Sequence, residues 1–159
     1  MSGMTDERWL REAVRLAAAN ADAGQLPFGA VVVRDGETLA TGVNTALTDR
    51  DPTAHAEVAA VRNACRALDV LHLTGAVVYS SCEPCAICHA VAATVGVTAL
   101  VYAAPKELIP DLRYPAPPDS APLAVPMQAA LRALAPEQLR HVPTPGADEP
   151  FRRYLAGLP

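Results

Sequence analysis

The chain has 159 residues and a mass of 16.6 kDa, which is the size of one compact domain. Of these residues 51% are hydrophobic but only 4% are aromatic, so Ala, Val and Leu must form most of the core. The formal net charge is −4, and no cluster of Lys and Arg is larger than the pair Arg152–Arg153. Proteins that bind nucleic acids usually have a basic face, so we expect a small-molecule substrate and no nucleic-acid partner.

The N-terminus and the cysteines indicate where the chain resides. The first ten residues lack the basic start and apolar run of a secretory signal, and no stretch has the roughly 18 apolar residues that a membrane span needs. Three of the four cysteines lie within seven positions, at 82, 85 and 88. This spacing is typical of a metal site in a reducing compartment rather than a disulfide framework, so we expect a cytoplasmic protein without a membrane segment.

The first part of the chain predicts a helix followed by a hairpin. Apolar residues recur at helical spacing over residues 6–23, with acidic residues at the start and Gly24 after the end. Residues 28–33 and 38–44 are β-prone runs, and the Asp35-Gly36 pair between them is a strong hairpin signal.

The next elements alternate between helix and strand. Residues 52–68 predict a helix, residues 76–80 a buried strand, residues 83–94 a helix with Pro84 in its first turn, and residues 97–102 another buried strand. The resulting order, α-β-β-α-β-α-β, is typical of an α/β layer fold in which helical crossovers join the strands.

The composition changes after Ala104, since twelve of the fifteen prolines lie from Pro105 onward. Residues 105–125 therefore predict an irregular and rather stiff connection, followed by short helices at 127–134 and 149–158. We interpret residues 1–159 as a single domain with a core over 5–104 and a proline-rich extension over 105–159, which lines the site or a dimer interface.

Two short motifs indicate a metal site: His55-Ala-Glu57 and Cys82-Glu-Pro-Cys85-Ala-Ile-Cys88. Cys85 and Cys88 lie three residues apart on the predicted helix, so both sulfurs point from one face, and the positive end of the helix dipole favours their thiolate forms. His55 lies near the start of the preceding helix. We expect crossovers from adjacent parallel strands to bring both helix starts to one edge of the sheet.

One His and two Cys provide three protein ligands for one zinc ion per chain and leave the fourth tetrahedral position open for water, as in catalytic zinc sites. Glu57, two residues from His55, is the natural proton carrier beside that water. We expect Glu57 to take a proton from the water, deliver it to a ring nitrogen of the substrate, and then protonate the departing amine, which leaves as ammonia.

Other cysteine chemistries are alternatives. A redox Cys-x-x-Cys pair would not explain the upstream His-x-Glu, and a structural zinc site has no use for a carboxylate beside an open position. The three clustered cysteines also resemble part of an iron–sulfur ligand set, but the downstream Cys-Pro is absent and only Cys65 is left as a fourth ligand. Cys82 is a possible ligand in place of Cys85, although we expect Cys82 to be a buried spectator and Cys65 to be a core residue.

The chain resembles the cytidine deaminase-like superfamily. The two motifs match the H-x-E and P-C-x-x-C signature of its zinc deaminases. Residues 27–30, 42–44, 51–57 and 81–85 are most similar to the bacterial guanine deaminase branch, and tRNA adenosine deaminases share the same skeleton. The resemblance covers roughly residues 5–104 and implies a three-layer α/β/α fold with a central five-stranded mixed sheet.

The resemblance also implies roles for residues around the substrate. It gives the same zinc ligands and proton carrier as the motifs do. Asn44 would form a hydrogen bond with the substrate ring or its substituent, Phe28 would border the base, and the backbone N–H of Ala56 would bind a ring carbonyl or nitrogen. Relatives are typically dimers, so we expect a homodimer.

The C-terminal segment departs from the guanine deaminase pattern. In that branch the segment helps to close the site, often over the neighbouring subunit, and its acidic residues hold the guanine. Here residues 105–114 contain no clear acidic pair, and Glu107 and Asp111 are the nearest candidates. Tyr154, in the terminal Phe-Arg-Arg-Tyr run, is a candidate for an aromatic lid or for a helix packing face.

These observations favour a zinc-dependent hydrolytic deaminase of a free purine base or nucleoside, with guanine as the best candidate. The alternatives are a deaminase of cytidine-like or other aminated heterocycles, a tRNA adenosine deaminase, and a zinc-stabilised binding domain without catalysis. The acidic charge counts against the tRNA enzyme, and Glu57 counts against the non-catalytic domain.

Overall fold

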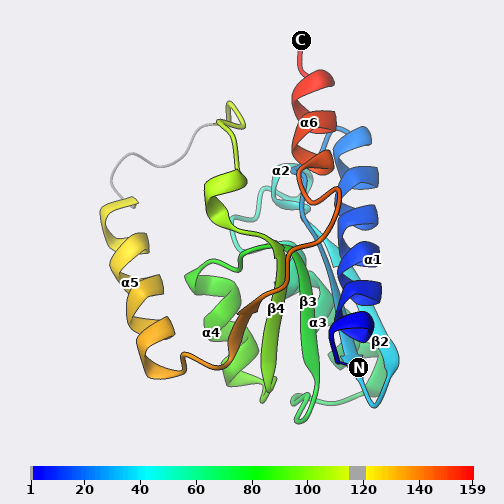
Figure 1. Ribbon diagram of the computed structural model, residues 1–159, viewed down its shortest axis with the longest axis vertical. Helices are drawn as coiled ribbons and strands as arrows, with labels where there is room; N and C mark the ends of the chain where they lie inside the picture. The colour runs from blue at the N-terminus through cyan, green and yellow to red at the C-terminus, as the bar shows by residue number, and fades with distance from the viewer. Residues whose placement is uncertain (1, 115–120) are drawn as a thin grey trace.

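The computed structural model describes residues 2–114 and 121–159, which form a five-stranded mixed sheet between layers of helices (Figure 1). The strands are β1 (Gly29–Arg34), β2 (Glu37–Val43), β3 (Val77–Cys82), β4 (Ala99–Ala104) and β5 (Leu139–His141), and they lie in the order β2-β1-β3-β4-β5. β1 is antiparallel to β2 and β3, whereas β3, β4 and β5 are parallel. The expected α/β/α fold with a five-stranded mixed sheet is confirmed.

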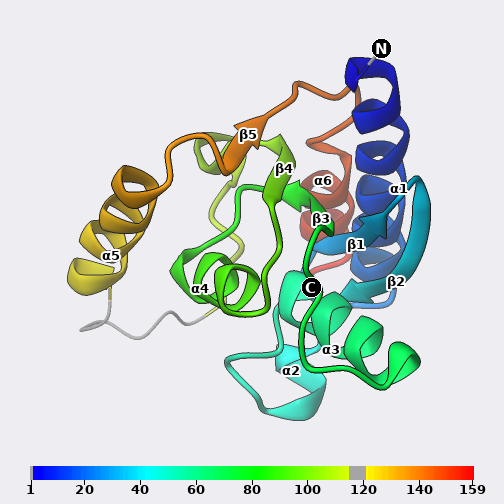
Figure 2. The same cartoon turned by 90° about the horizontal axis from the view of Figure 1, so that it is seen from below.

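Helices cover both faces of the sheet. They are α1 (Ser2–Asp22), α2 (Ala46–Asp49), α3 (Ala56–Leu68), α4 (Ala86–Thr94), α5 (Ala121–Leu134) and α6 (Glu149–Ala156), with a 3-10 turn, η1, at Lys106–Leu108. α1 and α6 lie on one face, α3 and α4 lie on the other, and α5 lies beside α4 (Figure 2). Within the described ranges, no helix has the length and apolar character needed to cross a membrane.

Alternating side chains on the strands build two cores. On β1, Val31 and Val33 pack in the core beneath α1 and α6, whereas Ala30 and Val32 pack in the core beneath α3 and α4. Because helices cover both faces, the strand positions are buried whichever way they point. This explains why the sequence shows continuous apolar runs rather than alternating polar and apolar residues.

Two glycine-containing positions in the backbone set how the β1–β2 hairpin turns and how α3 packs on it. Asp35 and Gly36 both have positive φ, 53° and 77°, as the predicted two-residue hairpin turn requires. A Cβ atom at Gly42 would collide with the backbone nitrogen of Ala60 and the carbonyl oxygen of Ala56, so α3 packs directly on the β2 backbone. This close packing fixes where the start of α3 lies.

The structure corrects two helix boundaries and one connection. α3 begins at Ala56 rather than Pro52, and α4 begins at Ala86 rather than Glu83, so His55 and Cys85 are N-cap residues. The strands that precede these helices, β2 and β3, are not adjacent as we expected, because β1 lies between them. Both are antiparallel to β1, so they still run in the same direction.

The C-terminal part is more regular than its prolines predicted. α5 begins at Ala121 rather than Met127, with Pro122 in its first turn, where a missing N–H is tolerated, and Pro126 further inside. η1 and β5 were not expected from the residue pattern, and β5 has only three residues. Residues 115–120 of the predicted irregular connection lie outside the described residues.

Candidate metal and catalytic site

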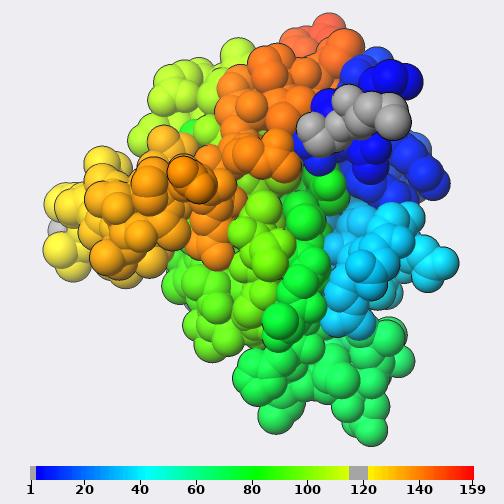
Figure 3. Space-filling model, turned by 60° about the horizontal axis from the view of Figure 1, so that its bottom comes forward, coloured from blue at the N-terminus to red at the C-terminus, as the bar shows by residue number. Residues whose placement is uncertain are grey.

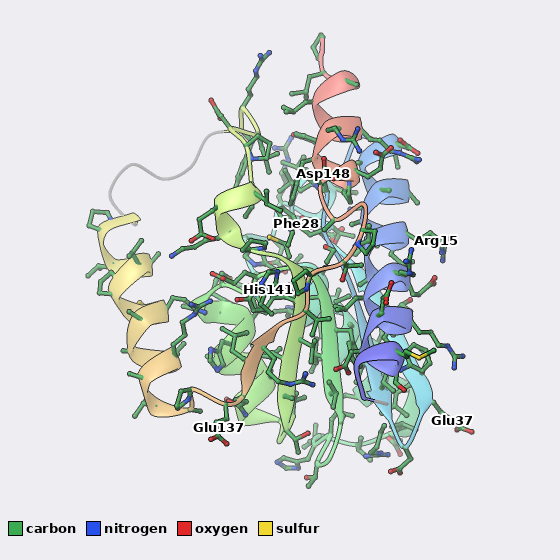
Figure 4. The ribbon with its side chains drawn as sticks, in the orientation of Figure 1. Arg15, Phe28, Glu37, Glu137, His141 and Asp148 are labelled. Carbon is green, nitrogen blue, oxygen red and sulfur yellow. The ribbon has the colours of Figure 1, made fainter. Side chains whose placement is uncertain are left out.

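One edge of the sheet collects the residues that the motifs singled out. β2 and β3 end at this edge, so α3 and α4 both start there, and the antiparallel β1 begins there. The parallel β4 and β5 also end at this edge, so the segments that follow them leave from the same side. In Figure 4, Phe28 marks this end of the molecule and lies beside α6, whereas Glu37 lies at the opposite end.

His55, Cys85 and Cys88 form a triangle of metal-binding atoms. Nδ1 of His55 lies 3.4 Å from each sulfur, and the two sulfurs lie 3.7 Å apart. Tetrahedral zinc, with Zn–S bonds of about 2.3 Å and Zn–N bonds of about 2.05 Å, requires separations of roughly 3.6 and 3.8 Å between these atoms. The donor atoms therefore fit one zinc ion, and no second group of three such ligands occurs within residues 2–114 and 121–159.

The protonation of the triangle also suits a cation. A hydrogen bond with the Cys88 thiol, together with one from His55, lowers the pKa of Cys85 to about 4. The same contact with Cys85 and burial raise the pKa of Cys88. A hydrogen bond with Cys85 raises the pKa of His55, to which a hydrogen bond with the Pro52 carbonyl also contributes. In the absence of a metal, the three groups share protons through these hydrogen bonds. A bound cation would take the place of those protons.

The two helices present their N-termini to the metal site. The carbonyl of His55 accepts a 2.9 Å hydrogen bond from the N–H of Ala59, and the carbonyl of Cys85 accepts a 3.0 Å bond from His89. Each N-cap residue thus opens its helix while its side chain stays outside the helical turn, free to reach the metal. The positive ends of both helix dipoles favour thiolates at this point.

Glu57 lies beside the triangle and is almost completely buried, with 7% of its surface exposed. Its Oε2 lies 3.1 Å from the Cys88 sulfur, and its Oε1 lies 2.5 Å from the hydroxyl of Ser80. Burial raises the pKa of Glu57 above the ordinary carboxyl value. A carboxyl group with a raised pKa next to a metal site is suited to carry protons in both directions.

The other two cysteines do not join the triangle. Cys82 ends β3 and is buried, and burial raises the pKa of its thiol. This matches the expected spectator. Cys65, in α3, is half-buried and packs against the core beneath α3 and α4, so it lies at the margin of that core rather than deep within it.

Phe28, Asn44 and Ala56 lie close together at the sheet edge. The carbonyl of Phe28 accepts a 3.2 Å hydrogen bond from the N–H of Asn44. Asn44 is buried, and its Oδ1 accepts a 3.0 Å bond from the N–H of Ala46. Ala56 is the first residue of α3, so its N–H has no acceptor within the helix. The ring of Phe28 packs edge-on against Phe151, with centroids 5.9 Å apart.

The three C-terminal candidates for substrate binding, Glu107, Asp111 and Tyr154, lie in different surroundings. Glu107 is exposed in η1, which follows β4 directly, and the last residue of β4, Ala104, pairs with Cys82 in the sheet, so η1 leaves from the same edge as α4. Asp111 is exposed, and its Oδ1 accepts a hydrogen bond from the N–H of Arg113. Tyr154 is buried in the core between α1 and α6. In the described part of the chain, no hydrogen bond or ring contact joins Asp111 or Tyr154 to the triangle.

Sequence reasoning did not single out two polar residues near the site. Ser80 contacts Glu57, and the Nδ2 of Asn20 donates hydrogen bonds to the carbonyls of Leu26 and Asn44, at 2.8 and 2.9 Å. A polar residue within a buried apolar strand was the available signal for Ser80. Nothing in the sequence pairs Asn20, in α1, with a loop 24 positions later.

A comparison with known protein families shows which family the chain belongs to. Residues 4–104 match the model of the cytidine and deoxycytidylate deaminase zinc-binding region. The chain belongs to this deaminase family. The matched residues include the whole triangle and Glu57, so the metal that fits the triangle is zinc.

Relatives of this chain act on different substrates. It is 49% identical over 86 residues to guanine deaminase from Bacillus subtilis, a match covering 54% of this chain and 55% of that protein. It is 39% identical over 85 residues to tRNA-specific adenosine deaminase from Aquifex aeolicus, covering 54% and 56%. The chain thus spans about half the length of the curated relatives it matches. The solved structure of guanine deaminase from Nitrosomonas europaea, 25% identical, is similar with a TM-score of 0.73 over 94% of this chain and 84% of that one.

Proposed function

We propose that this chain catalyses the zinc-dependent hydrolytic deamination of a purine base, with guanine as the preferred substrate. The observation that carries the proposal is the buried Glu57 carboxyl, 3.1 Å from a sulfur of the three-ligand triangle. Three protein ligands leave one tetrahedral position for water, which a purely structural site would fill with protein.

Glu57 performs the proton transfers in this reaction. Zinc, when bound, lowers the pKa of a water molecule to near neutrality and so supplies a nucleophile. Glu57 accepts the proton that the water gives up and passes it to the ring nitrogen beside the amino-bearing carbon, while the water oxygen bonds to that carbon. Glu57 then carries the second proton to the amino group, the carbon–nitrogen bond breaks, and ammonia leaves. Guanine and water would give xanthine and ammonia.

Residues around the sheet edge would hold the base. The side-chain amide of Asn44 and the free N–H of Ala56 would form hydrogen bonds with the ring, and Phe28 would border its face. Glu107, in η1 directly after β4, is a better candidate than Asp111 to accept hydrogen bonds from guanine N–H groups, because an oxygen of Asp111 already accepts one from Arg113. Tyr154 would act indirectly by supporting α6, which brings Phe151 against Phe28.

Two features support a free purine base over other substrates. The guanine deaminase of Nitrosomonas europaea is similar over nearly the whole chain, including the C-terminal segment. The net charge of −4 is unfavourable for binding a tRNA backbone. tRNA adenosine deamination is the second candidate because a relative of that kind is 39% identical. The homodimer and the cytoplasmic location remain predictions.

Glu57→Gln tests the proton-transfer role. We expect this variant to bind one zinc per chain, as the wild type does, and to release ammonia at least about 10²-fold to 10⁴-fold more slowly, because general acid–base catalysis contributes this much. Metal analysis and an ammonia assay measure the two properties. Full turnover by Glu57→Gln would show that another group carries the proton.

A panel of substrates tests the preference. Ammonia release is measured with guanine, guanosine, deoxyguanosine, adenine, adenosine, cytosine and cytidine, and inosine formation is measured in a tRNA anticodon stem-loop. We expect turnover of guanine above all others. Turnover of guanosine but not guanine would assign a nucleoside enzyme, and turnover of the stem-loop alone would assign a tRNA enzyme.

A further inference from the structure

α5 attaches to the rest of the molecule through a polar face rather than an apolar one. Among its described side chains, only Gln128 is buried and only Leu131 and Arg132 are half-buried, whereas the apolar Leu123, Val125, Met127 and Leu134 are 55% to 82% exposed. α5 projects from one side of the molecule and lies against α4 (Figures 2 and 3). Burial of an apolar stripe, the usual reason for a helix to pack, therefore does not explain its position.

The buried polar groups of α5 hold the turn that leads into the zinc motif. The Nε2 of Gln128 donates a 3.0 Å hydrogen bond to the carbonyl of Pro84. The guanidinium of Arg132, one helical turn further along, lies 2.6 Å from a carboxylate oxygen of Glu83, whose side chain is only 6% exposed. Two side chains of α5 thus hold the two residues immediately before Cys85.

These contacts leave two buried polar atoms of α5 without hydrogen bonds. The Oε1 of Gln128 and the Nε of Arg132 are buried, and neither has a hydrogen-bond partner in the described structure. Leaving buried polar atoms unpaired is unfavourable. Apolar side chains at both positions would remove these unpaired atoms, but they would also leave the buried Glu83 carboxylate and the Pro84 carbonyl without these partners, so the two polar side chains are coupled to the turn.

The turn that they hold positions the most exposed zinc ligand. Cys85 is exposed, whereas Cys88 is buried within α4. The backbone of Cys85 is extended, and its neighbour Pro84 lies between β3 and α4, so the turn before Cys85 sets the approach of this sulfur together with α4. Groups that orient metal ligands from outside the ligand shell are known to affect metal affinity strongly.

We propose that α5 is a clamp on the zinc-binding turn: Gln128 and Arg132 are positioning residues that hold Pro84 and Glu83, and through them keep Cys85 at the metal. This inference rests on the zinc assignment but not on the identity of the substrate. It gives a role to a helix that lies outside residues 4–104, which the deaminase family model matches.

The test measures the rate at which the purified, zinc-loaded chain releases zinc to a chromogenic chelator. Arg132→Met and Gln128→Leu should each release zinc about tenfold faster, in keeping with the ten- to hundredfold effects of such outer groups. Arg132→Lys should be intermediate, because it keeps the charge. Glu83→Gln should add little to Arg132→Met, because the two residues act through one contact.

Two matched variants separate positioning from general loss of stability. Met127→Ala changes an exposed side chain of α5. Arg153→Met breaks an ion pair with Asp22 that joins α6 to α1 and does not involve α5. Both should release zinc at the wild-type rate. The thiolate-to-metal absorption of the cobalt-substituted chain should change in Arg132→Met and Gln128→Leu, and not in the two controls.

Three results are distinguishable. Wild-type release rates and cobalt spectra in both Arg132→Met and Gln128→Leu would overturn the clamp. Faster release that only follows the loss of thermal stability, in controls and variants alike, would also overturn it. A wild-type chain that bound no zinc would instead contradict the metal assignment on which the proposed deaminase activity rests.

Discussion

In the proposed deamination, Glu57 holds a proton at one stage and releases it at another, and Ser80 is placed to pair with it in both states. The Ser80 hydroxyl lies 2.5 Å from Oε1 of Glu57 and 2.7 Å from the carbonyl oxygen of Cys82. A hydroxyl can donate one hydrogen bond and accept others. Ser80 can therefore donate to an ionised Glu57, or accept from a protonated Glu57 while donating to Cys82, so the buried Glu57 carboxyl has a hydrogen-bond partner in both states.

Ser80→Ala should accordingly slow the reaction without weakening substrate binding. Loss of one buried hydrogen bond, about 1 to 1.5 kcal/mol, corresponds to a roughly five- to tenfold lower kcat. Ser80→Thr, which keeps the hydroxyl, should retain most of the activity. Steady-state kinetics with the preferred base measure both constants. A change confined to KM would indicate that Ser80 acts on binding rather than on proton transfer.

The raised pKa of Glu57 also predicts how the metal-free fold responds to pH. Because burial raises this pKa, the folded chain keeps the Glu57 proton over a range in which the unfolded chain, with a carboxyl pKa of about 4.3, has lost it. The contribution of Glu57 to stability is therefore present at acidic pH and is lost as pH rises through the folded-state pKa. Glu57→Gln cannot ionise, so it escapes this loss.

Melting temperatures of the zinc-free proteins between pH 5 and pH 8 test this. We expect Glu57→Gln to be more stable than the wild type at pH 8, and the difference to shrink as pH falls towards 5. Glu37→Gln, an exposed change in the hairpin, is the control and should show no such trend. A gap that widened towards acidic pH would mean that folding lowers the Glu57 pKa instead.

Among the elements, α3 can pack closely on β2 only because residue 42 is a glycine without a side chain. Gly42 lies where a Cβ would press on the backbone of Ala56 and Ala60, and α3 carries Glu57 in its first turn. Gly42→Ala must push α3 away from β2 or bend the strand. We expect a loss of about 1 to 3 kcal/mol in the free energy of unfolding, the usual cost of overpacking, together with weaker zinc binding.

Urea unfolding of the zinc-loaded chain and chelator competition measure these effects. Gly3→Ala is a suitable control, because a Cβ at Gly3 would have no neighbour within 4 Å, and the variant should be no less stable than the wild type. If Gly42→Ala matched Gly3→Ala in both measurements, the closeness of α3 to β2 would not matter for the site.

The sequence predicted the elements of residues 5–104 well, except for the four-residue α2, because the longer ones have strong local signals. The apolar runs, the Asp35-Gly36 turn and the two zinc motifs all depend on neighbouring residues. The helix starts were placed too early, because Pro52 and Pro84 favour a first helical turn, whereas His55 and Cys85 must stay outside the helices at the site. The function of these residues thus overrode a local preference.

The rest could not be predicted because it depends on contacts distant in the chain. β5 has three residues without a strong β-forming pattern, and it exists as a strand because β4 offers a partner. The contacts of Ser80 with Glu57, of Asn20 with Asn44, and of Arg132 with Glu83 each join different elements. A single sequence contains no local signal for such pairs.

At the scale of the whole molecule, Asp6 joins the N-terminal helix to strands from the middle and the end of the chain. This carboxylate is 5% exposed. Its Oδ1 accepts a 2.8 Å hydrogen bond from the hydroxyl of Tyr79 in β3, and its Oδ2 lies 3.1 Å from the guanidinium of Arg140 in β5. Burial and the bond with Asp6 raise the pKa of Tyr79, so its hydroxyl remains a donor. The short β5 depends on this attachment more than a longer strand would.

Asp6→Asn keeps the bond with Tyr79 but removes the charge opposite Arg140, so it should lower the free energy of unfolding by about 1 to 2 kcal/mol, as expected for a hydrogen bond between charged groups. Glu7→Gln, which breaks an exposed ion pair with Arg11, should cost less than about 1 kcal/mol. Urea unfolding measures both. Arg140→Met should add little in the Asp6→Asn background, because one contact is lost in either case. Equal stability of the Asp6 and Glu7 variants would show that α1 and β5 are held by their apolar contacts alone.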